Sequence, residues 1–381
     1  MRDTTATGAG EREASADPTK AGSGLRLRSL DAVRVALAFA VLAYHLSGTI
    51  ALEKYFGVEA FAHLFSVGDA RIPFFFVLSG FLLTLLHGDR AGSTRVAIDY
   101  VRRRALRIFP TYWVVLLLVI AATLLLPGYS NRLPADPWVL AKAFLLIPQA
   151  PEVAGPTGAP LVVVAWTLHY ELVWYAVFGA FLAHVWLGTA GVALLAANFL
   201  ACHEGTCGFY RDFLASPYLV HFAIGAVAAL VSRRLAPSAR TRAIAWLALA
   251  GYFVLAALQY VVATPWTPGD SGIAFALVAG VVLACLAAVE RDRPTRRNGV
   301  LALLADSSYA LYLLHFPALS ALLKLLTWSG LAGPWGATTA FVLAFAACVA
   351  AAVAFHRWIE TPLLARLRRR RAFARPFGRR A

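Results

Sequence analysis

Charged residues are scarce in this 381-residue chain, and so are the signatures of soluble enzymes. Only 14% of its residues are charged and 60% are hydrophobic, whereas soluble domains average about 25% charged and about 45–50% apolar residues. The chain contains no Walker-type phosphate loop, dinucleotide-binding fingerprint, heptad run or internal repeat. These absences leave no soluble catalytic domain and indicate a protein that buries its apolar surface in lipid.

Cysteine is also rare, with four residues in the whole chain. Cys202 and Cys207 share a predicted outer loop and are candidates for a disulfide. Cys285 and Cys348 lie in apolar runs and are interpreted as small packing residues. A Cys-x4-Cys pair with no second ligand pair nearby does not make a zinc site, so we predict no metal.

Apolar runs fill most of the sequence. A membrane-spanning helix needs about 20 apolar residues, and helices satisfy their backbone hydrogen bonds internally in lipid. We therefore predict an all-α, polytopic transmembrane bundle of about ten helices. The runs lie at 30–52, 72–87, 110–127, 161–183, 185–200, 216–231, 243–263, 272–289, 301–327 and 336–358.

Basic residues divide unequally between the two sets of loops. With ten spans, one side of the membrane carries 28 basic residues and the other carries five. Cytoplasmic loops are enriched in Lys and Arg, so both termini are predicted to be cytoplasmic. The formal net charge of +15 then reports membrane orientation, and we expect no nucleic-acid partner.

Three regions follow from this pattern. Residues 1–29 are polar and lack the apolar stretch of a signal peptide, so they are predicted to be a disordered cytoplasmic tail. Residues 30–362 form the transmembrane domain. Residues 363–381 are a basic cytoplasmic tail that attracts anionic membrane lipids. The chain is expected in the plasma membrane of a bacterium.

Ionisable side chains inside a span are costly and are functional hypotheses by default. Arg34 and His45 are eleven residues apart in the first span, which places them on one helix face roughly 16 Å apart. Asp31 shares this stripe, so the stripe faces the bundle interior. A neutral His45 imidazole can accept a proton from an alcohol. The alternative is a structural histidine that hydrogen-bonds another helix.

Two further spans carry polar groups. Glu171 lies in the run 161–183, where Arg34 is one of few cationic partners. Glu171 binds an acceptor hydroxyl, orients the histidine, or forms a structural ion pair. Tyr309, Tyr312 and His315 step by three residues along one edge of the run 301–327.

Two motifs allow both a functional and a structural interpretation. Arg103, Arg104 and Arg107 share a helix face, and guanidinium groups match phosphate oxygens; ordinary anchoring on the cytoplasmic side is the alternative. Ser79 and Gly80 permit close helix packing. Ser79 lacks the Gly-x-Ser-x-Gly context of a hydrolase nucleophile.

Taken together, these segments resemble the acyltransferase type 3 family of integral-membrane enzymes. In chain order, the matching segments are Leu30-Asp31-x-x-Arg34 leading to His45, the Phe75–Phe81 stretch FFVLSGF, Arg103-Arg104-x-x-Arg107 before Pro110, Trp166-Thr167-Leu168-x-x-Glu171, Ser308-Tyr309-x-x-Tyr312-Leu313-x-His315-x-Pro317, and Glu360-x-Pro362. The resemblance covers the chain from about residue 28 to 362. No single segment is specific, but six in this order are.

The resemblance implies an enzyme of about ten helices that takes acyl groups from coenzyme A. The family's essential histidine matches His45, its partner arginine matches Arg34, and its cytoplasmic arginine motif matches Arg103, Arg104 and Arg107. Family members acylate sugars, lipids or antibiotics.

We therefore expect a membrane-bound O-acyltransferase. It would move an acyl group, in the first instance acetyl, from cytoplasmic acyl-CoA to a hydroxyl of a cell-envelope glycan, a lipid-linked sugar or a small-molecule metabolite. Acyl-CoA is the donor co-substrate, and no cofactor is bound permanently. The main alternative is a proton-coupled transporter or flippase, because buried ionisable groups also serve proton relays.

The expected roles divide the candidate residues into three groups. The catalytic set is His45, Arg34 and Glu171, the donor-binding set is Arg103, Arg104 and Arg107, and the substrate-binding set is Trp166, Tyr309, Tyr312, His315 and Ser79.

Overall fold

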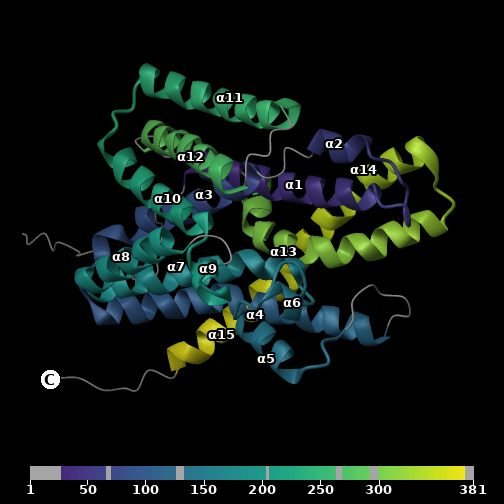
Figure 1. Cartoon of the computed structure of the whole chain (residues 1–381), viewed down its shortest axis with the longest axis horizontal. Helices are drawn as coiled ribbons and strands as arrows, with labels where there is room; N and C mark the ends of the chain where they lie inside the picture. The colour runs from purple at the N-terminus through teal and green to yellow at the C-terminus, as the bar shows by residue number, and fades with distance from the viewer. Residues whose placement is uncertain are drawn as a thin grey trace, which may run out of the picture.

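The computed structural model describes residues 27–65, 70–125, 133–202, 206–262, 268–291 and 299–373. Within these ranges the chain is a bundle of helices without strands (Figure 1). This confirms the predicted all-α transmembrane bundle. The predicted N-terminal tail up to residue 26 and residues 374–381 lie outside the described residues.

A long helix occupies each of the ten predicted apolar runs. These helices are α1 (Arg28–Ile50), α3 (Arg71–His87), α4 (Thr94–Leu125), α7 (Trp166–Ala183), α8 (Val185–Ala201), α10 (Pro217–Arg234), α11 (Ala239–Val262), α12 (Pro268–Glu290), α13 (Gly299–Trp328) and α14 (Gly333–Phe355). The shorter elements are α2 (Ala60–Phe65), α5 (Pro137–Leu145), α6 (Pro151–Ala154), α9 (Phe209–Leu214), α15 (Thr361–Phe373), the 3-10 turns η2 (Gly88–Arg90) and η3 (Val163–Ala165), and the π-helical turn η4 (His356–Glu360).

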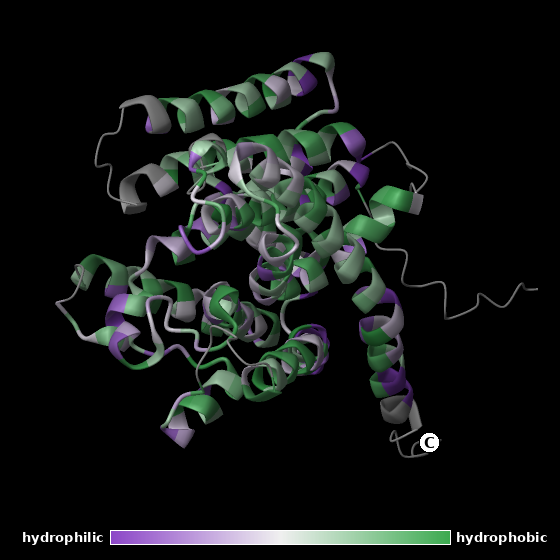
Figure 2. Cartoon of the chain, turned by 90° about the vertical axis from the view of Figure 1, so that its right-hand side faces the viewer, coloured by the Kyte–Doolittle hydropathy of each residue, from purple (hydrophilic) through white to green (hydrophobic). Residues whose placement is uncertain are grey.

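Hydrophobic residues cover most of the long helices, whereas hydrophilic residues gather near helix ends and along α15 (Figure 2). Within the described ranges, eight helices are long and apolar enough to cross a membrane, and α8 is a shorter apolar helix. The chain is therefore a multi-pass membrane protein. The count of ten spans and the cytoplasmic position of both termini stay predictions.

Two helix boundaries differ from the sequence-based expectation. Helix α4 begins at Thr94 and continues through Pro110, so the Arg103–Arg107 segment belongs to the same continuous helix as the apolar run. Helix α7 begins only at Trp166, because the chain before it forms the η3 turn and Leu161 adopts a positive φ of 67°. That backbone conformation is incompatible with a right-handed helix.

Glycines bring α3 and α10 into backbone contact. A Cβ atom on Gly80 would lie 2.1 Å from the carbonyl oxygen of Phe222, and one on Gly225 would lie 2.0 Å from that of Val77. Each helix thus contributes a glycine at the point where the other backbone passes, as in other close-packed membrane helices. The small pair at Ser79 and Gly80 therefore has the packing function that the sequence suggested.

The remaining long helices pack in three groups beside this contact. Helix α12 packs on both α10 and α11, α13 packs on both α1 and α14, and α7 packs on both α4 and α8. Glu290, at the end of α12, fixes the start of α1: its carboxylate accepts hydrogen bonds from the backbone N–H groups of Arg28 and Ser29, each at 2.9 Å. A carboxylate at a helix N-terminus satisfies free donors and complements the helix dipole.

Candidate active site

His45 and His315 meet between α1 and α13. The Nδ1 atom of His45 lies 3.0 Å from Nε2 of His315, and their ring centroids are 5.0 Å apart. The His315 side chain is only 1% exposed. The sequence could place each histidine on its own helix, but the contact between them is a finding of the structure.

Hydrogen bonds determine which ring nitrogens carry protons when both rings are neutral. The Nδ1 atom of His315 lies 3.0 Å from the carbonyl oxygen of Leu311, and a carbonyl only accepts, so His315 is protonated on Nδ1. Its Nε2 is then an acceptor, and the Nδ1–H group of His45 donates to it. This tautomer leaves the Nε2 lone pair of His45 available to take a proton.

Arg71, the first residue of α3, adds a positive charge beside the two histidines. Its guanidinium lies 3.5 Å from the centre of the Tyr44 ring, a cation–π contact. It also interacts electrostatically with His45 and His315. Sequence reasoning counted Arg71 only among the outer charges. An arginine at the first position of an apolar run was the signal that could have drawn attention to it.

Tyr312 links this histidine pair to the start of α7. Its hydroxyl donates to the carbonyl oxygen of Val164 at 2.7 Å and lies 2.8 Å from the Thr167 hydroxyl. The Tyr312 ring lies 6.0 Å from His315 and stacks on Phe75. We use the name histidine cluster for Tyr44, His45, Arg71, Tyr312 and His315.

Arg34 lies among charges of both signs. It interacts electrostatically with Asp31 on its own helix, with Asp306 on α13 and with Arg107 on α4. Arg34 also interacts electrostatically with Tyr175, the hydrogen-bond partner of Glu171, which the sequence suggested as a partner for Arg34. The two acidic groups offset the repulsion between the two arginines.

Glu171 belongs to a different set of contacts. Its carboxylate accepts a hydrogen bond of 2.6 Å from the Tyr175 hydroxyl, one helical turn further along α7. Arg104 interacts electrostatically with Glu171. The Arg104 guanidinium lies over the rings of Tyr175 and Tyr100, at 5.1 and 5.5 Å from their centres. Arg104 is thus held between α4 and α7.

The three arginines of α4 therefore differ in their surroundings. Arg104 is partly buried, whereas Arg103 and Arg107 are exposed. Arg107 acts on Arg34 and on Tyr175. We use the name arginine cluster for Arg34, Arg104, Arg107, Glu171 and Tyr175. Arg103 interacts electrostatically with His87 at the end of α3.

The remaining predicted residues line the surroundings of the two clusters. The Tyr309 hydroxyl donates to the carbonyl oxygen of Ile108 at 3.1 Å and so ties α13 to α4. Ser79 is partly buried, and its side-chain hydroxyl makes no hydrogen bond with the described residues. Trp166 packs against Phe76 and Tyr218.

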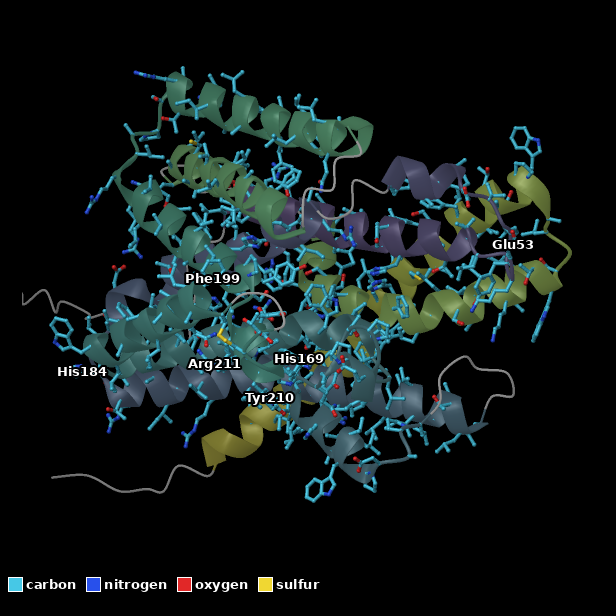
Figure 3. The ribbon with its side chains drawn as sticks, viewed as in Figure 1. Glu53, His169, His184, Phe199, Tyr210 and Arg211 are labelled. Atoms are coloured by element: carbon cyan, nitrogen blue, oxygen red, sulfur yellow. A yellow bond between two sulfur atoms is a disulfide. The ribbon has the colours of Figure 1, made fainter. Side chains whose placement is uncertain are left out.

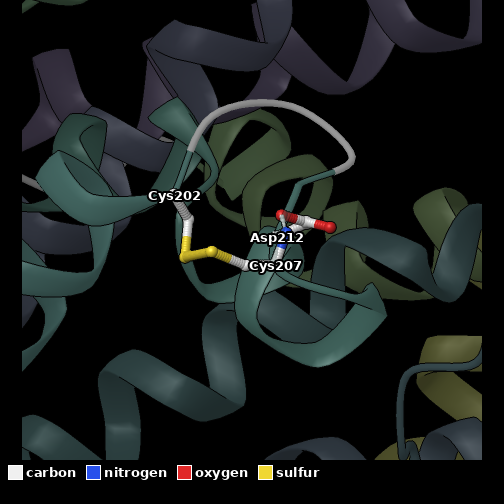
Figure 4. A group of neighbouring side chains, drawn as sticks. All are labelled: Cys202, Cys207 and Asp212. Atoms are coloured by element: carbon white, nitrogen blue, oxygen red, sulfur yellow. Dashed lines mark hydrogen bonds between the residues drawn. A yellow bond between two sulfur atoms is a disulfide. The ribbon is translucent and has the colours of Figure 1, made fainter.

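A disulfide joins Cys202 to Cys207 in the predicted outer loop before α9 (Figure 4). Asp212, which the figure draws beside it, accepts a hydrogen bond of 3.2 Å from the backbone N–H of Cys207. The sulfur atoms are bonded to each other, so they do not serve as metal ligands. The short helix α9 is thereby fixed at its N-terminal end.

Comparisons with known proteins identify relatives of the chain. A family model described as an acyltransferase domain matches residues 27–357. The chain is 30% identical over 334 residues to the exopolysaccharide production protein ExoZ of Rhizobium meliloti (strain 1021), covering 85% of this chain and 98% of the relative. It is 27% identical over 390 residues to the acyltransferase MdmB of Streptomyces mycarofaciens, covering 92% of this chain and 95% of the relative.

No solved structure matches the chain at a significant level. The family match covers most of the chain, from the start of α1 to the π-helical turn that carries Glu360. It includes both the histidine cluster and the arginine cluster. The chain is an acyl-transferring enzyme and belongs to the acyltransferase type 3 family of integral-membrane acyltransferases.

Proposed function

We propose that the protein is an O-acyltransferase of the plasma membrane that moves an acyl group, in the first instance acetyl, from cytoplasmic acyl-CoA to a hydroxyl of a glycan, glycolipid or metabolite. The observation that carries this proposal is the hydrogen bond between His45 and His315. A histidine held in one tautomer by a second polar group, with its other nitrogen free, is the arrangement of a general base.

In the proposed reaction, Nε2 of His45 takes the proton of the acceptor hydroxyl while the oxygen attacks the thioester carbonyl. The carbon–sulfur bond then breaks, the new ester forms, and the protonated His45 returns its proton to the departing CoA sulfur. The products are the acylated acceptor and free CoA thiol. No other reactant is needed.

His315 and Arg71 support His45 in different ways. His315 accepts the Nδ1–H bond and so fixes the His45 ring, which makes it a positioning residue in place of the substrate-binding role inferred from sequence. Arg71 supplies the positive charge nearest to the two rings. Its guanidinium is suited to the oxyanion that develops on the thioester carbonyl.

The arginine cluster suits the donor. Arg104 and Arg107 lie on α4, and Arg34 lies on α1 about 16 Å from His45 along the same helix. The CoA phosphates bind the arginines in this proposal, and the extended pantetheine arm passes Arg34 towards His45. Glu171 contributes by holding Arg104 and Tyr175 in place.

The test is an assay of thiol release with the purified protein in lipid nanodiscs. Wild-type protein should release CoA thiol from acetyl-CoA when a hydroxyl acceptor is supplied. His45→Gln keeps the polarity of the ring but cannot act as a base, so it should lose at least about a hundredfold in rate. Thiol release that is equal in wild type and His45→Gln would contradict the proposal.

A further inference from the structure

A cavity of about 390 Å³ lies beside the start of α7, apart from both clusters. Its volume falls within the range of about 300–1,000 Å³ that ligand pockets occupy. The walls come from the loop around α6, from α7, from α9 and from the first turn of α10. Figure 3 labels His169 of α7, one of the lining residues, and Tyr210 of α9.

Five aromatic side chains line one part of this cavity's wall. Tyr170 stacks on Phe213 with ring centroids 4.4 Å apart, and Trp166 and Tyr170 each lie 5.3 Å from Tyr218. Phe209 completes the aromatic wall from α9. Contacts among these rings fix their planes, so they present rigid flat surfaces to a ligand.

The polar groups of the cavity are all uncharged amides, hydroxyls or imidazole. No Asp, Glu, Lys or Arg side chain is among the described residues that line it. The Gln149 side chain is only 3% exposed; its Nε2 donates to the carbonyl oxygen of Val139 at 3.1 Å. Its Oε1 atom is buried without a hydrogen-bond partner among the described residues. Almost none of the surface of this oxygen is open to the cavity, so the Gln149 amide shapes the wall by holding Val139.

The backbone around Gln149 is shaped to form this wall. Gly158 has a φ of 64°, and a Cβ atom there would lie 2.2 Å from the carbonyl oxygen of Gln149. Only glycine fits this position, for both conformational and steric reasons. The N–H of Gly158 donates to the carbonyl oxygen of Gly155 at 2.8 Å and closes the turn.

We propose that this cavity is a subsite for the acceptor and that it binds one of the acceptor's neutral glycosyl rings. This inference rests on the proposed acyl transfer to a hydroxyl. The C–H face of a sugar ring packs on aromatic planes, while its hydroxyls form hydrogen bonds with hydroxyl groups of the lining such as that of Tyr170. The absence of charge in the described lining disfavours phosphate and carboxylate ligands, and its amide and hydroxyl groups disfavour a hydrocarbon chain.

A short path of contacts connects this cavity to the base. Trp166 lines the cavity, and the next residue, Thr167, has its hydroxyl 2.8 Å from that of Tyr312. The Tyr312 ring lies 6.0 Å from His315, which contacts His45. A sugar ring seated in the cavity is therefore separated from the histidine cluster by the Thr167–Tyr312 contact, and the hydroxyl that is acylated belongs to a neighbouring part of the same acceptor.

The test compares two adjacent residues of α9. Phe209 lines the cavity, whereas Tyr210 is 53% exposed and does not. Binding of neutral tetrasaccharides of glucose, galactose, mannose or N-acetylglucosamine is measured by calorimetry in nanodiscs, since maltoside detergents would compete. At least one neutral sugar should bind wild type and Tyr210→Ala alike, and Phe209→Ala should weaken its binding by roughly tenfold. A charged tetragalacturonate should not bind.

Binding of no neutral sugar, or equal loss in Phe209→Ala and Tyr210→Ala, would overturn this assignment. The readout does not require acyl transfer, so it is independent of the donor chemistry. Acetyl-CoA turnover without sugar binding that depends on the Phe209 ring would contradict only the acceptor subsite. Sugar binding that depends on the Phe209 ring, without any acetyl-CoA turnover, would instead contradict the proposed acyl-CoA reaction.

Discussion

The Nδ1 atom of His45 donates to Nε2 of His315 across the interface of α1 and α13. The second nitrogen of His315 is already committed to a backbone carbonyl of its own helix. This chain of two hydrogen bonds gives the two histidines different chemical properties, although both are imidazoles. His45 has a free basic nitrogen, and His315 has none.

The first prediction separates these two roles. His45→Gln should abolish acyl transfer at saturating donor, because a general base contributes about 10²–10⁴ to rate. His315→Gln should lower kcat by a smaller factor, because the side-chain amide still offers an acceptor for the His45 Nδ1–H bond. His315→Ala, which offers none, should be more severe than His315→Gln. Equal activity of the two His315 variants would show that position 315 acts through packing alone. Rates are normalised to protein in the membrane.

The second prediction concerns the charge beside the histidines. Arg71→Gln should lower kcat by roughly 10²–10³, the usual cost of losing an oxyanion donor, with little change in the donor KM. Lys54→Gln is the matched control, because Lys54 also lies over a tyrosine ring, 5.2 Å from the centre of Tyr55. The measurement is the steady-state kcat and KM of both variants. A selective rise in acceptor KM in Arg71→Gln would assign Arg71 to acceptor binding instead.

The third prediction concerns the donor phosphates. Arg107→Ala and Arg103→Ala should each raise the KM for acyl-CoA roughly tenfold to a hundredfold, because a charge-assisted contact is worth about 1.5–3 kcal/mol. Arg104→Lys should do the same and should also loosen the packing around Glu171 and Tyr175, since lysine lacks the planar guanidinium. Arg95→Ala, exposed near the start of the same helix, is the control. An unchanged KM for acyl-CoA in a variant with alanine at all three positions would show that these arginines only orient the chain in the membrane.

The fourth prediction tests the α3–α10 contact. Gly225→Ala places a methyl group against the backbone of Val77, and overpacking of this kind costs about 1–3 kcal/mol or more. The thermal midpoint in detergent should fall. Gly251→Ala on α11 is the control, because nothing lies within 4 Å of its Cβ position. Its midpoint should stay level or rise, since alanine favours helix.

The fifth prediction addresses topology. A cysteine at position 53 should react with an impermeant thiol reagent in intact cells, and a cysteine at position 95 should react only after permeabilisation. The basis is the distribution of 28 basic residues against five. The background is low, because the free thiols of Cys285 and Cys348 are buried and the other two cysteines form a disulfide. Reversed labelling would invert the orientation.

The sequence predicted the long helices well, because each depends on a local run of apolar residues. It could not predict that α4 continues through Pro110, since neighbouring helices decide whether a proline ends a helix in lipid. The interaction of Glu171 with Arg104 depends on how α4 and α7 rotate against each other. No local pattern encodes that rotation.

The cavity could not be predicted from the sequence for a related reason. Trp166 was predicted to bind substrate, but Gln149 and Phe209 come from segments without a periodic pattern, and only the folded chain brings them beside Trp166. Short helices such as α6 and α9 lack the length for a hydrophobic signal. The lining of the cavity is therefore the part of the site that is hardest to predict from sequence.

The glycine contact between α3 and α10 has a consequence for motion. Because backbone touches backbone at Gly80 and Gly225, these two helices have no side-chain layer that could deform, and they behave as one rigid unit. Relative motion of the helices must then occur at interfaces that are formed by side chains, including the interface between α1 and α13. A gap at that interface would separate His45 from His315. A fluctuation that let water reach the thioester would therefore also impair the base that could activate this water for hydrolysis.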